Sequence, residues 1–156
     1  MSEIQIRTAR TGDLEFIVSL VSRLTDGFEL PSWREPRQMN SVDAEVLSRV
    51  LSTNPPDAII FIAEDENGVS LGFIHLNVST DYYEHENHGH ISDIIVAPNG
   101  EGRGVGKALM AAGEDWARNR GFKSLTLNVF GNNARARNLY EKIGYAEDMI
   151  KYRKEL

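Results

Sequence analysis

A glycine-rich stretch after an apolar run is the part of this sequence with the clearest chemistry. Residues 96–109 read VAPNGEGRGVGKAL, and glycines at 102, 104 and 106 lead into a helical pattern. Glycine permits tight turns and lets backbone N–H groups approach a ligand closely. The first turn of a helix adds unpaired N–H donors and a field that favours an anion. The stretch therefore predicts a phosphate-bearing ligand, with Arg103 and Lys107 adding positive charge.

Two common phosphate-binding motifs do not fit this spacing. A P-loop needs a glycine five residues before Gly106, where this chain has Glu101, and a Ser or Thr where it has Ala108. A dinucleotide fingerprint needs two residues before its third glycine, and here only Val105 intervenes. We therefore expect neither a P-loop nucleotide nor NAD. On the glycines alone, a connection without any ligand is an equal alternative.

A second motif lies downstream, in the segment VFGNNARARNLYEKIGY. Asn133 begins a helical pattern, and Tyr140 follows two turns later on the same side. Together the two segments resemble the GNAT superfamily of acetyl-CoA-dependent N-acetyltransferases. The first family signature is Gln or Arg, two residues, Gly, one residue, then Gly or Ala, and here only its first position departs, as Glu101. The second signature is matched at Asn133, Ala136, Leu139–Tyr140 and Gly144–Tyr145.

The resemblance implies acetyl-CoA as the cosubstrate, bound between two parallel strands that splay apart, here 90–96 and 125–129. Its pantetheine would pair with the backbone near Ile94, Val96 and Pro98. Its pyrophosphate would lie against the glycine stretch, whose implied contact residues are Glu101, Gly102, Arg103, Gly104, Val105, Gly106 and Lys107.

The roles that the resemblance implies for Asn133, Lys107 and Glu101 need a further remark. Asn133, together with Ala136, would contact the pantetheine, but Asn is also a preferred helix N-cap in any protein. Lys107 is equally well explained as a solvated lysine in a first helical turn. An acid at Glu101 would oppose a pyrophosphate if it pointed inward, so we expect its side chain to point to solvent.

Acetyl transfer to an amine needs a neutral nucleophile, a donor for the thioester oxyanion and an acid for the departing thiolate. The resemblance assigns the acid to Tyr140, although a tyrosine on an apolar helix face is otherwise a core residue. A backbone N–H in the strand that ends at Val96 would bind the oxyanion.

The base is sought in the segment HGHISDIIV. Family members often place a carboxylate on this strand, and the version with two adjacent acids is reduced here to Ser92 and Asp93. Strand alternation puts His90 and Ser92 on one face and Asp93 on the other, which slightly favours His90 as the base. A β-bulge would reverse this parity and favour Asp93.

In this family the acceptor usually meets the loop between the first two helices and the loop before the CoA-binding strand. Their aromatic and acidic side chains suit a cationic amine with an apolar part. The candidate acceptor-binding residues are Phe28, Glu29, Trp33, Tyr82, Tyr83 and Glu84. Arg34 and Arg37 would instead fit an acceptor that carries a carboxylate, and both loops could be merely solvated. The prediction is a small amine of unspecified identity.

The helices and strands that must position these residues alternate irregularly along the chain. The patterns predict a strand, two helices, three strands, a helix, a strand, a helix and a last strand. The second helix is expected over 42–51, after a loop or broken helix at 26–40, and the last strand over 145–153. This order predicts an α/β (α+β, mixed-sheet) fold with helices flanking a central sheet, as one domain over residues 1–156.

Composition limits the alternatives. The chain has 156 residues and a net charge of −6, which argues against general nucleic-acid binding. It has no cysteine, which excludes disulfides, thiolate metal sites and cysteine-based catalysis. No apolar run approaches the ~20 residues of a membrane helix, so a cytoplasmic protein without a membrane partner is expected. No metal is expected, because the four histidines lack a recognised ligand spacing. A homodimer would be usual for the resembled family.

Two other functions stay open at this point. One is a non-catalytic acyl-CoA-binding domain, which the departures at Ser92 and Glu101 favour and Tyr140 opposes. The other is acetylation of a protein N-terminus or lysine, which would need an open groove rather than a small-molecule pocket.

Overall fold

The computed structural model describes residues 3–156 and comprises two compact units. The larger unit contains residues 3–26 and 30–128, and the smaller one contains 27–29 and 129–156. Within residues 3–156, no helix is both long and apolar enough to cross a bilayer. The expected cytoplasmic location stays a prediction.

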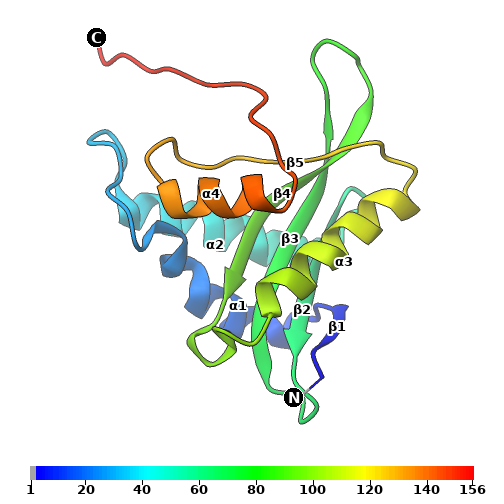
Figure 1. The fold of residues 1–156 in the computed structure, drawn as a ribbon. Coiled ribbons are helices and arrows are strands. Elements are labelled where there is room, and N and C mark those ends of the chain that lie inside the picture. Colours follow the sequence, from blue (N-terminus) through cyan, green and yellow to red (C-terminus); the bar gives the residue numbers. More distant parts are fainter. Residues whose placement is uncertain (1–2) are drawn as a thin grey trace. The chain divides into compact units, whose positions relative to one another are not determined.

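Five strands of the larger unit form one sheet in the order β1-β2-β3-β4-β5 (Figure 1). The strands are β1 (Gln5–Thr8), β2 (Ala58–Glu64), β3 (Ser70–Thr80), β4 (Asn87–Val96) and β5 (Leu125–Leu127). Neighbours are antiparallel except β4 and β5, which are parallel. The predicted mixed α/β fold class is confirmed.

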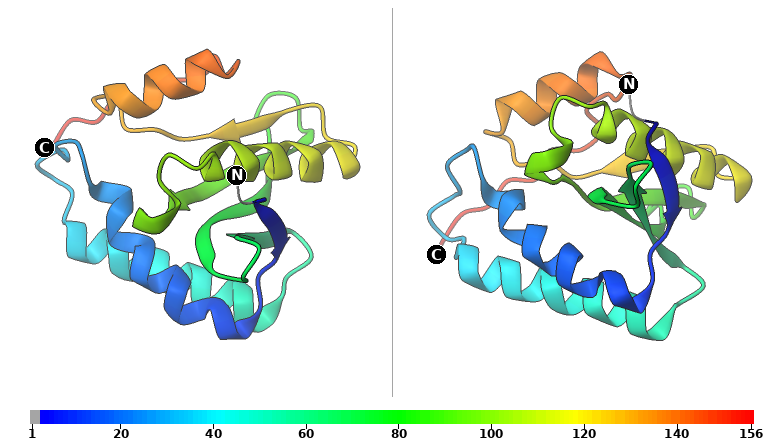
Figure 2. Two further views of the ribbon diagram at one scale, coloured as in Figure 1. Left: turned by 60° about the horizontal axis from the view of Figure 1, so that its bottom comes forward. Right: turned by 90° about the horizontal axis from the view of Figure 1, so that it is seen from below.

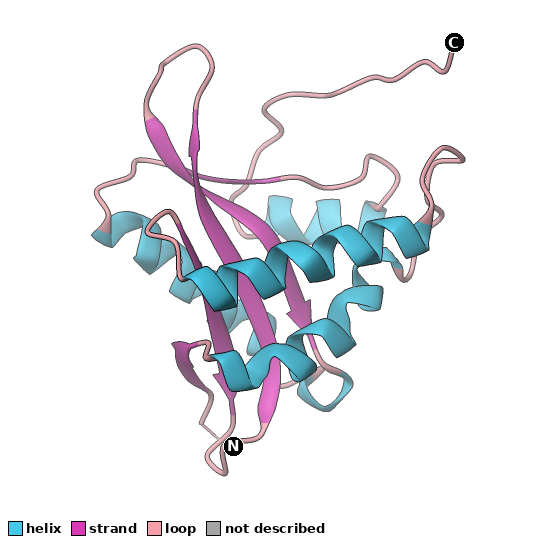
Figure 3. Ribbon diagram, turned by 180° about the vertical axis from the view of Figure 1, so that it is seen from behind, coloured by secondary structure: helices cyan, strands magenta, loops and turns pink. Residues whose placement is uncertain are grey.

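Helices cover both faces of this sheet. Helix α3 (Val105–Asn119) lies on the face toward the viewer in Figure 1, whereas α1 (Leu14–Leu20) and α2 (Pro36–Thr53) lie on the other face, toward the viewer in Figure 3. Figure 2 shows the sheet between them. Because both faces are buried, β3 is apolar almost continuously: Phe73 packs in a core cluster with Leu47 of α2, while Ile74 and Leu76 meet α3 at Gly113.

A β-bulge interrupts β4 at Ser92. His75 of β3 pairs with Asp93, but the next residue, Leu76, pairs with Ile91, so Ser92 is the extra residue on β4. Its hydroxyl donates to the side-chain oxygen of Asn77. The extra residue reverses the alternation beyond it, so that His90, Asp93 and Ile95 all face α1 and α2. Simple alternation, which separated His90 from Asp93, is therefore wrong, and the bulged alternative is the observed one.

Several predicted elements differ from the structure, and strand β4, for example, begins at Asn87 and not at 90. Helix α2 begins at Pro36 and not near 42, because proline is tolerated in a first helical turn and Glu35 caps the helix by accepting from the amide of Arg37. Strand β5 ends at Leu127. Residues 145–156 form no helix or strand, because an alternating pattern alone does not make a strand without a partner for its ladder.

The smaller unit contains α4 (Ala134–Lys142), and side-chain contacts join its two segments. The rings of Phe28 and Phe130 lie 5.4 Å apart, and the amide of Asn132 donates to the carbonyl of Glu29. These contacts join residues 27–29 to the segment that precedes α4.

Candidate active site

The glycine stretch forms a turn that opens toward the first turn of α3. Gly102 and Gly104 have φ of 72° and 80°, a left-handed conformation that strongly favours glycine, and no atom lies within 4 Å of where a Cβ would stand on either. Gly104 is the N-cap of α3. In the described part of the chain, the amides of Val105, Gly106 and Lys107 have no backbone or side-chain acceptor. These free donors beside open space fit a phosphate group.

The other glycines of the stretch differ from this pair. A Cβ on Gly100 would stand 2.6 Å from the carbonyl oxygen of Leu71, so Gly100 is required for packing of the turn Pro98–Gly100 against β3. A Cβ on Gly106 would meet Val96 at 3.6 Å, an ordinary contact. Gly100 is thus needed for packing, whereas the position of Gly106 has room for an alanine, as the Gly-or-Ala signature allows.

Charged side chains surround the turn in a way that the sequence alone did not reveal. Glu101 is 62% exposed and forms an ion pair with Arg23, from the 3₁₀ turn Val21–Thr25. The guanidinium of Arg103 donates to the carbonyl of Asn99 at 3.2 Å and lies 3.9 Å from a carboxylate oxygen of Asp65. Lys107 is exposed. Arg23 thus offsets the acid at the unusual first position of the signature.

Strands β4 and β5 are paired over a short length only. The pairs join Gly89–Ile91 to Leu125–Leu127, whereas β4 continues to Val96 on its β3 side. From Ser92 to Val96 the second edge of β4 is therefore free of β5. This is where Ile94, Val96 and Pro98 were predicted to meet the pantetheine, and an exposed strand edge suits such an added partner.

On the side of β4 that faces α2, His75, Asp93 and Asp43 form a polar cluster. The Nδ1 of His75 lies 3.0 Å from Oδ2 of Asp93, and their side chains are 4% and 11% exposed. Asp43 of α2 faces this pair closely enough to interact electrostatically with both. Burial, and then the negative charge of Asp93, raises the pKa of Asp43 to about 6, although His75 opposes the shift.

His90 lies on the same face and is bonded to β5. Its Nδ1 is 2.7 Å from the hydroxyl of Thr126. Burial, and then the neighbouring His88, lowers the pKa of His90, so its imidazole is neutral near pH 7. Both predicted bases, His90 and Asp93, are therefore present on one face with a protein partner each.

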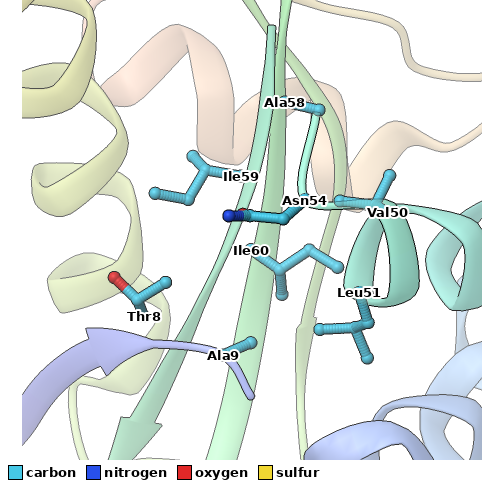
Figure 4. A pocket seen from close by; sticks show the side chains of 8 residues that line it. All are labelled: Thr8, Ala9, Val50, Leu51, Asn54, Ala58, Ile59 and Ile60. Carbon is cyan, nitrogen blue, oxygen red and sulfur yellow. The ribbon is translucent and has the colours of Figure 1, made fainter. Parts of the chain in front are cut away.

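A pocket of about 280 Å³ opens beside the polar cluster. Its lining residues come from the loop before α2 and from the first turns of that helix: Trp33, Arg34, Glu35, Gln38, Met39, Val42 and Asp43. The pocket in Figure 4, between β1, β2 and the end of α2, has only about 30 Å³ and holds no more than one or two water molecules. Of these two pockets, the one lined by Trp33 and Asp43 is the larger.

The predicted acceptor residues do not form one group. Trp33 lines the 280 Å³ pocket, whereas Tyr82, Tyr83 and Glu84 lie in the turn between β3 and β4, which Figures 1 and 2 show well apart from residues 30–35. Tyr82 and Tyr83 stack edge to face on each other and are 80% and 75% exposed. The remaining two, Phe28 and Glu29, belong to the smaller unit.

The smaller unit holds the second motif. Asn133 caps α4 by accepting from the amide of Ala136 at 3.3 Å. Tyr140 packs edge to face against Tyr145, with ring centres 6.1 Å apart. Burial raises the pKa of Tyr140, so its phenol stays protonated at neutral pH, as an acid for a thiolate requires.

Sequence reasoning missed Asp43 and His75 as members of this site. The available signal was that Asp43 precedes Leu47 by one helical turn, so an acid occupies the apolar stripe of α2. For His75 the signal was a histidine inside the apolar run of β3. Neither signal by itself names a partner, because the partners come from different elements.

Comparisons with known proteins match this chain to acetyltransferases. Residues 24–145 match the model of the Acetyltransferase (GNAT) family. The chain is 30% identical over 145 residues to the "Uncharacterized N-acetyltransferase YhfO" of Bacillus subtilis (strain 168), covering 93% of this chain and 91% of that protein. It is also 30% identical over 160 residues to the streptothricin acetyltransferase of Streptomyces lavendulae, covering 93% and 82%.

A solved structure shows the same fold with a ligand. AAC(6')-Iy, in complex with the bisubstrate analog CoA-S-monomethyl-acetylneamine, superposes with a TM-score of 0.69 at 25% identity. The match covers 99% of this chain and 100% of that one.

Proposed function

This chain belongs to the GNAT family of acetyltransferases and is an N-acetyltransferase, and we propose that it transfers the acetyl group of acetyl-CoA to a primary amine of a small molecule. We further propose direct attack of the amine within a ternary complex. Acetyl transfer and the use of acetyl-CoA follow from the family; the kind of acceptor and the ternary mechanism are the proposed parts.

One observation carries the proposal: strand β4 has a free edge next to the glycine turn, and on its α2-facing side the nearly buried Asp93 faces the half-buried Asp43. The free edge at Ser92–Val96 and the amides of Val105–Lys107 would hold acetyl-CoA by its pantetheine and pyrophosphate. Asp93 lies on the same strand and faces Asp43. The acyl donor and the proton acceptor would thus both lie beside β4. Direct transfer needs the two reactants to be held together in this way.

The proposed reaction assigns one role to each group. The neutral amine nitrogen attacks the thioester carbon and forms the C–N bond, while a backbone N–H near Ile94 donates to the carbonyl oxygen. The C–S bond then breaks, and the thiolate takes a proton from Tyr140. The attacking nitrogen then loses one proton, which restores the phenol of Tyr140, and the amide is complete.

A small-molecule acceptor is supported by the pocket and by a relative. A volume of about 280 Å³ is near the lower end for small-ligand sites and has no room for a folded chain. Trp33, Glu35 and Asp43 in its lining suit a cationic amine, although Arg34 also lies there. The streptothricin acetyltransferase, by its name, acetylates streptothricin, a small molecule.

The proposal is tested by thiol release from acetyl-CoA in the presence of a panel of amines. The panel contains diamines, aminoglycosides, streptothricin, free amino acids and a peptide with a free N-terminus. Turnover with one of the small amines, and not with the peptide, is the expected result. Turnover with the peptide alone would contradict the small-molecule acceptor, and binding of acetyl-CoA without any turnover would favour a non-catalytic domain.

A further inference from the structure

We propose that Asp43 of α2 accepts the proton that the acceptor's ammonium group loses before attack, and that Asp93 and His75 are positioning residues behind it. The inference rests on the proposed function and names the group that prepares the nucleophile. It differs from the sequence expectation, in which His90 or Asp93 takes this role.

The packing of α2 on the sheet places Asp43 over this pair. Leu47 packs in one core cluster with Phe73 of β3 and Ile95 of β4. Asp43 lies one helical turn before Leu47, while His75 and Asp93 lie two residues from Phe73 and Ile95 on the same face. One helical turn and two strand residues advance the chain by similar lengths, about 5–7 Å. Asp43 therefore faces His75 and Asp93 much as Leu47 faces Phe73 and Ile95.

Access to the pocket distinguishes Asp43 from the other candidates. Asp43 lines the 280 Å³ pocket, and His75, His90 and Asp93 do not. The carboxylate of Asp93 already accepts from His75, and the side chains of both are nearly buried. The Nδ1 of His90 is engaged by Thr126. A ligand in the pocket thus meets the carboxylate of Asp43 first.

Two buried polar atoms, one in the polar cluster and one on the Asp43 side of α2, have no hydrogen-bond partner among the described residues. In the described part of the chain, Oδ1 of Asn40 and Nε2 of His75 are buried without a hydrogen-bond partner. Asn40 lies on α2, three residues before Asp43, and so on the same side of the helix. Buried polar atoms without partners are uncommon and indicate a ligand or water that completes the network.

The charges that face Asp43 explain why it can release and regain a proton near neutral pH. From the sheet these are Asp93 and His75, and across the pocket they are Arg34 and Glu35. Burial and Asp93 raise the pKa of Asp43 to about 6. Helix α1 contributes only Glu15, which is exposed. A base with this proton affinity is a carboxylate at pH 7–8 but binds a proton more readily than an ordinary aspartate.

The proton balance is simple. The ammonium gives one proton to the Asp43 carboxylate, and the amine then attacks the acetyl carbon of acetyl-CoA. The second proton, lost from nitrogen as the C–S bond breaks, balances the one that the thiolate gains. Asp43 returns its proton to solvent, so the products are the acetylated amine, coenzyme A and one released proton.

The test compares Asp43→Asn with Glu45→Gln, which removes an exposed acid two residues away on the same helix. Steady-state kinetics with the best amine of the panel are measured from pH 5 to 9, and acetyl-CoA binding is measured by calorimetry. In the wild type we expect kcat/KM for the amine to fall as pH drops below about 6, because Asp43 becomes protonated there. Asp43→Asn should lower kcat/KM by about 10²- to 10³-fold and abolish that acid limb, with acetyl-CoA affinity unchanged. Glu45→Gln should match the wild type.

A second variant tests the positioning role. Asp93→Asn removes the like charge near Asp43, so the acid limb should move to lower pH while turnover persists. Loss of the limb in Asp93→Asn but not in Asp43→Asn would overturn the inference and make Asp93 the base. Wild-type turnover that Asp43→Asn retains in full would also overturn it, while leaving the proposed function intact. A wild type that binds acetyl-CoA but acetylates no amine would contradict both.

Discussion

The two surfaces that meet along β4 are built from different parts of the chain. On the α3 side and at the free edge, the proposed acetyl-CoA site consists of backbone amides and glycines from one continuous segment. On the α2 side, the proposed proton-accepting site consists of side chains from α2, β3 and β4. A site built from backbone should be sensitive to added side chains, and a site built from side chains should be sensitive to their removal. The following variants test that contrast.

The largest effect is expected from Gly104→Glu. A side chain at φ of 80° strains the turn, and a carboxylate there would repel a pyrophosphate, so the acetyl-CoA dissociation constant should rise by at least about 100-fold. Calorimetric titration measures this. The matched control is Gly121→Glu, which has φ of 77° and open space at the other end of α3. Equal losses in both variants would mean that strain, and not the cradle, is responsible.

A smaller effect, on stability, should separate two glycines of the same segment. Gly100→Ala places a Cβ against the carbonyl of Leu71 and should lower the free energy of unfolding by about 1–3 kcal/mol. Gly106→Ala has room and lies in a helix, so it should be neutral or slightly stabilising. Urea denaturation measures both. Equal destabilisation by the two substitutions would contradict the assignment of Gly100 to packing.

Asp43→Asn should stabilise the protein at pH 8 while it impairs activity. The folded pKa of about 6 exceeds the unfolded value of 3.8, so Asp43 lowers stability progressively as pH rises from about 4 through 6. Because Asp43 is only half-buried, solvent screening limits the gain to about 1 kcal/mol, or ~2–4 °C in Tm. Thermal denaturation should show this gain at pH 8 and none at pH 4. A lower Tm at pH 8 would show that the Asp43 charge is stabilising.

The smallest effect concerns the charges around the cradle. Arg23→Gln leaves Glu101 without its ion-pair partner, so acetyl-CoA binding should weaken by about two- to fivefold at low salt. Adding Glu101→Gln should restore the affinity, and 0.5 M salt should reduce the difference. An Arg23→Gln variant with unchanged affinity at low salt would mean that Glu101 is too distant to matter.

The contrast between the two surfaces also explains what the sequence could predict. The glycines at 102 and 104 predict a site made of backbone groups. Both have positive φ and open space around them, and they lie in one short segment that the sequence shows directly. The individual strands of the sheet, α3 and α4 follow from hydrophobic periodicity in the same local way. These parts of the prediction required no knowledge of which segments pair.

Prediction of the polar cluster would have required knowing which segments pair. The face of the sheet on which Asp93 lies depends on the bulge at Ser92, and this bulge arises only where β4 pairs with β3. The raised pKa of Asp43 depends first on its burial against the sheet and then on Asp93, which lies fifty residues away in sequence. The start of α2 was misplaced for a different reason: Pro36 breaks a helix interior but is accommodated at its first turn.

One calorimetric experiment tests the division of roles most directly: titration of acetyl-CoA into the wild type, Gly104→Glu and Asp43→Asn under the same conditions. We expect binding to be lost in Gly104→Glu and unchanged in Asp43→Asn, because the first alters the backbone-built surface and the second the side-chain-built one. Loss of binding in Asp43→Asn, or full binding by Gly104→Glu, would contradict this account of the site.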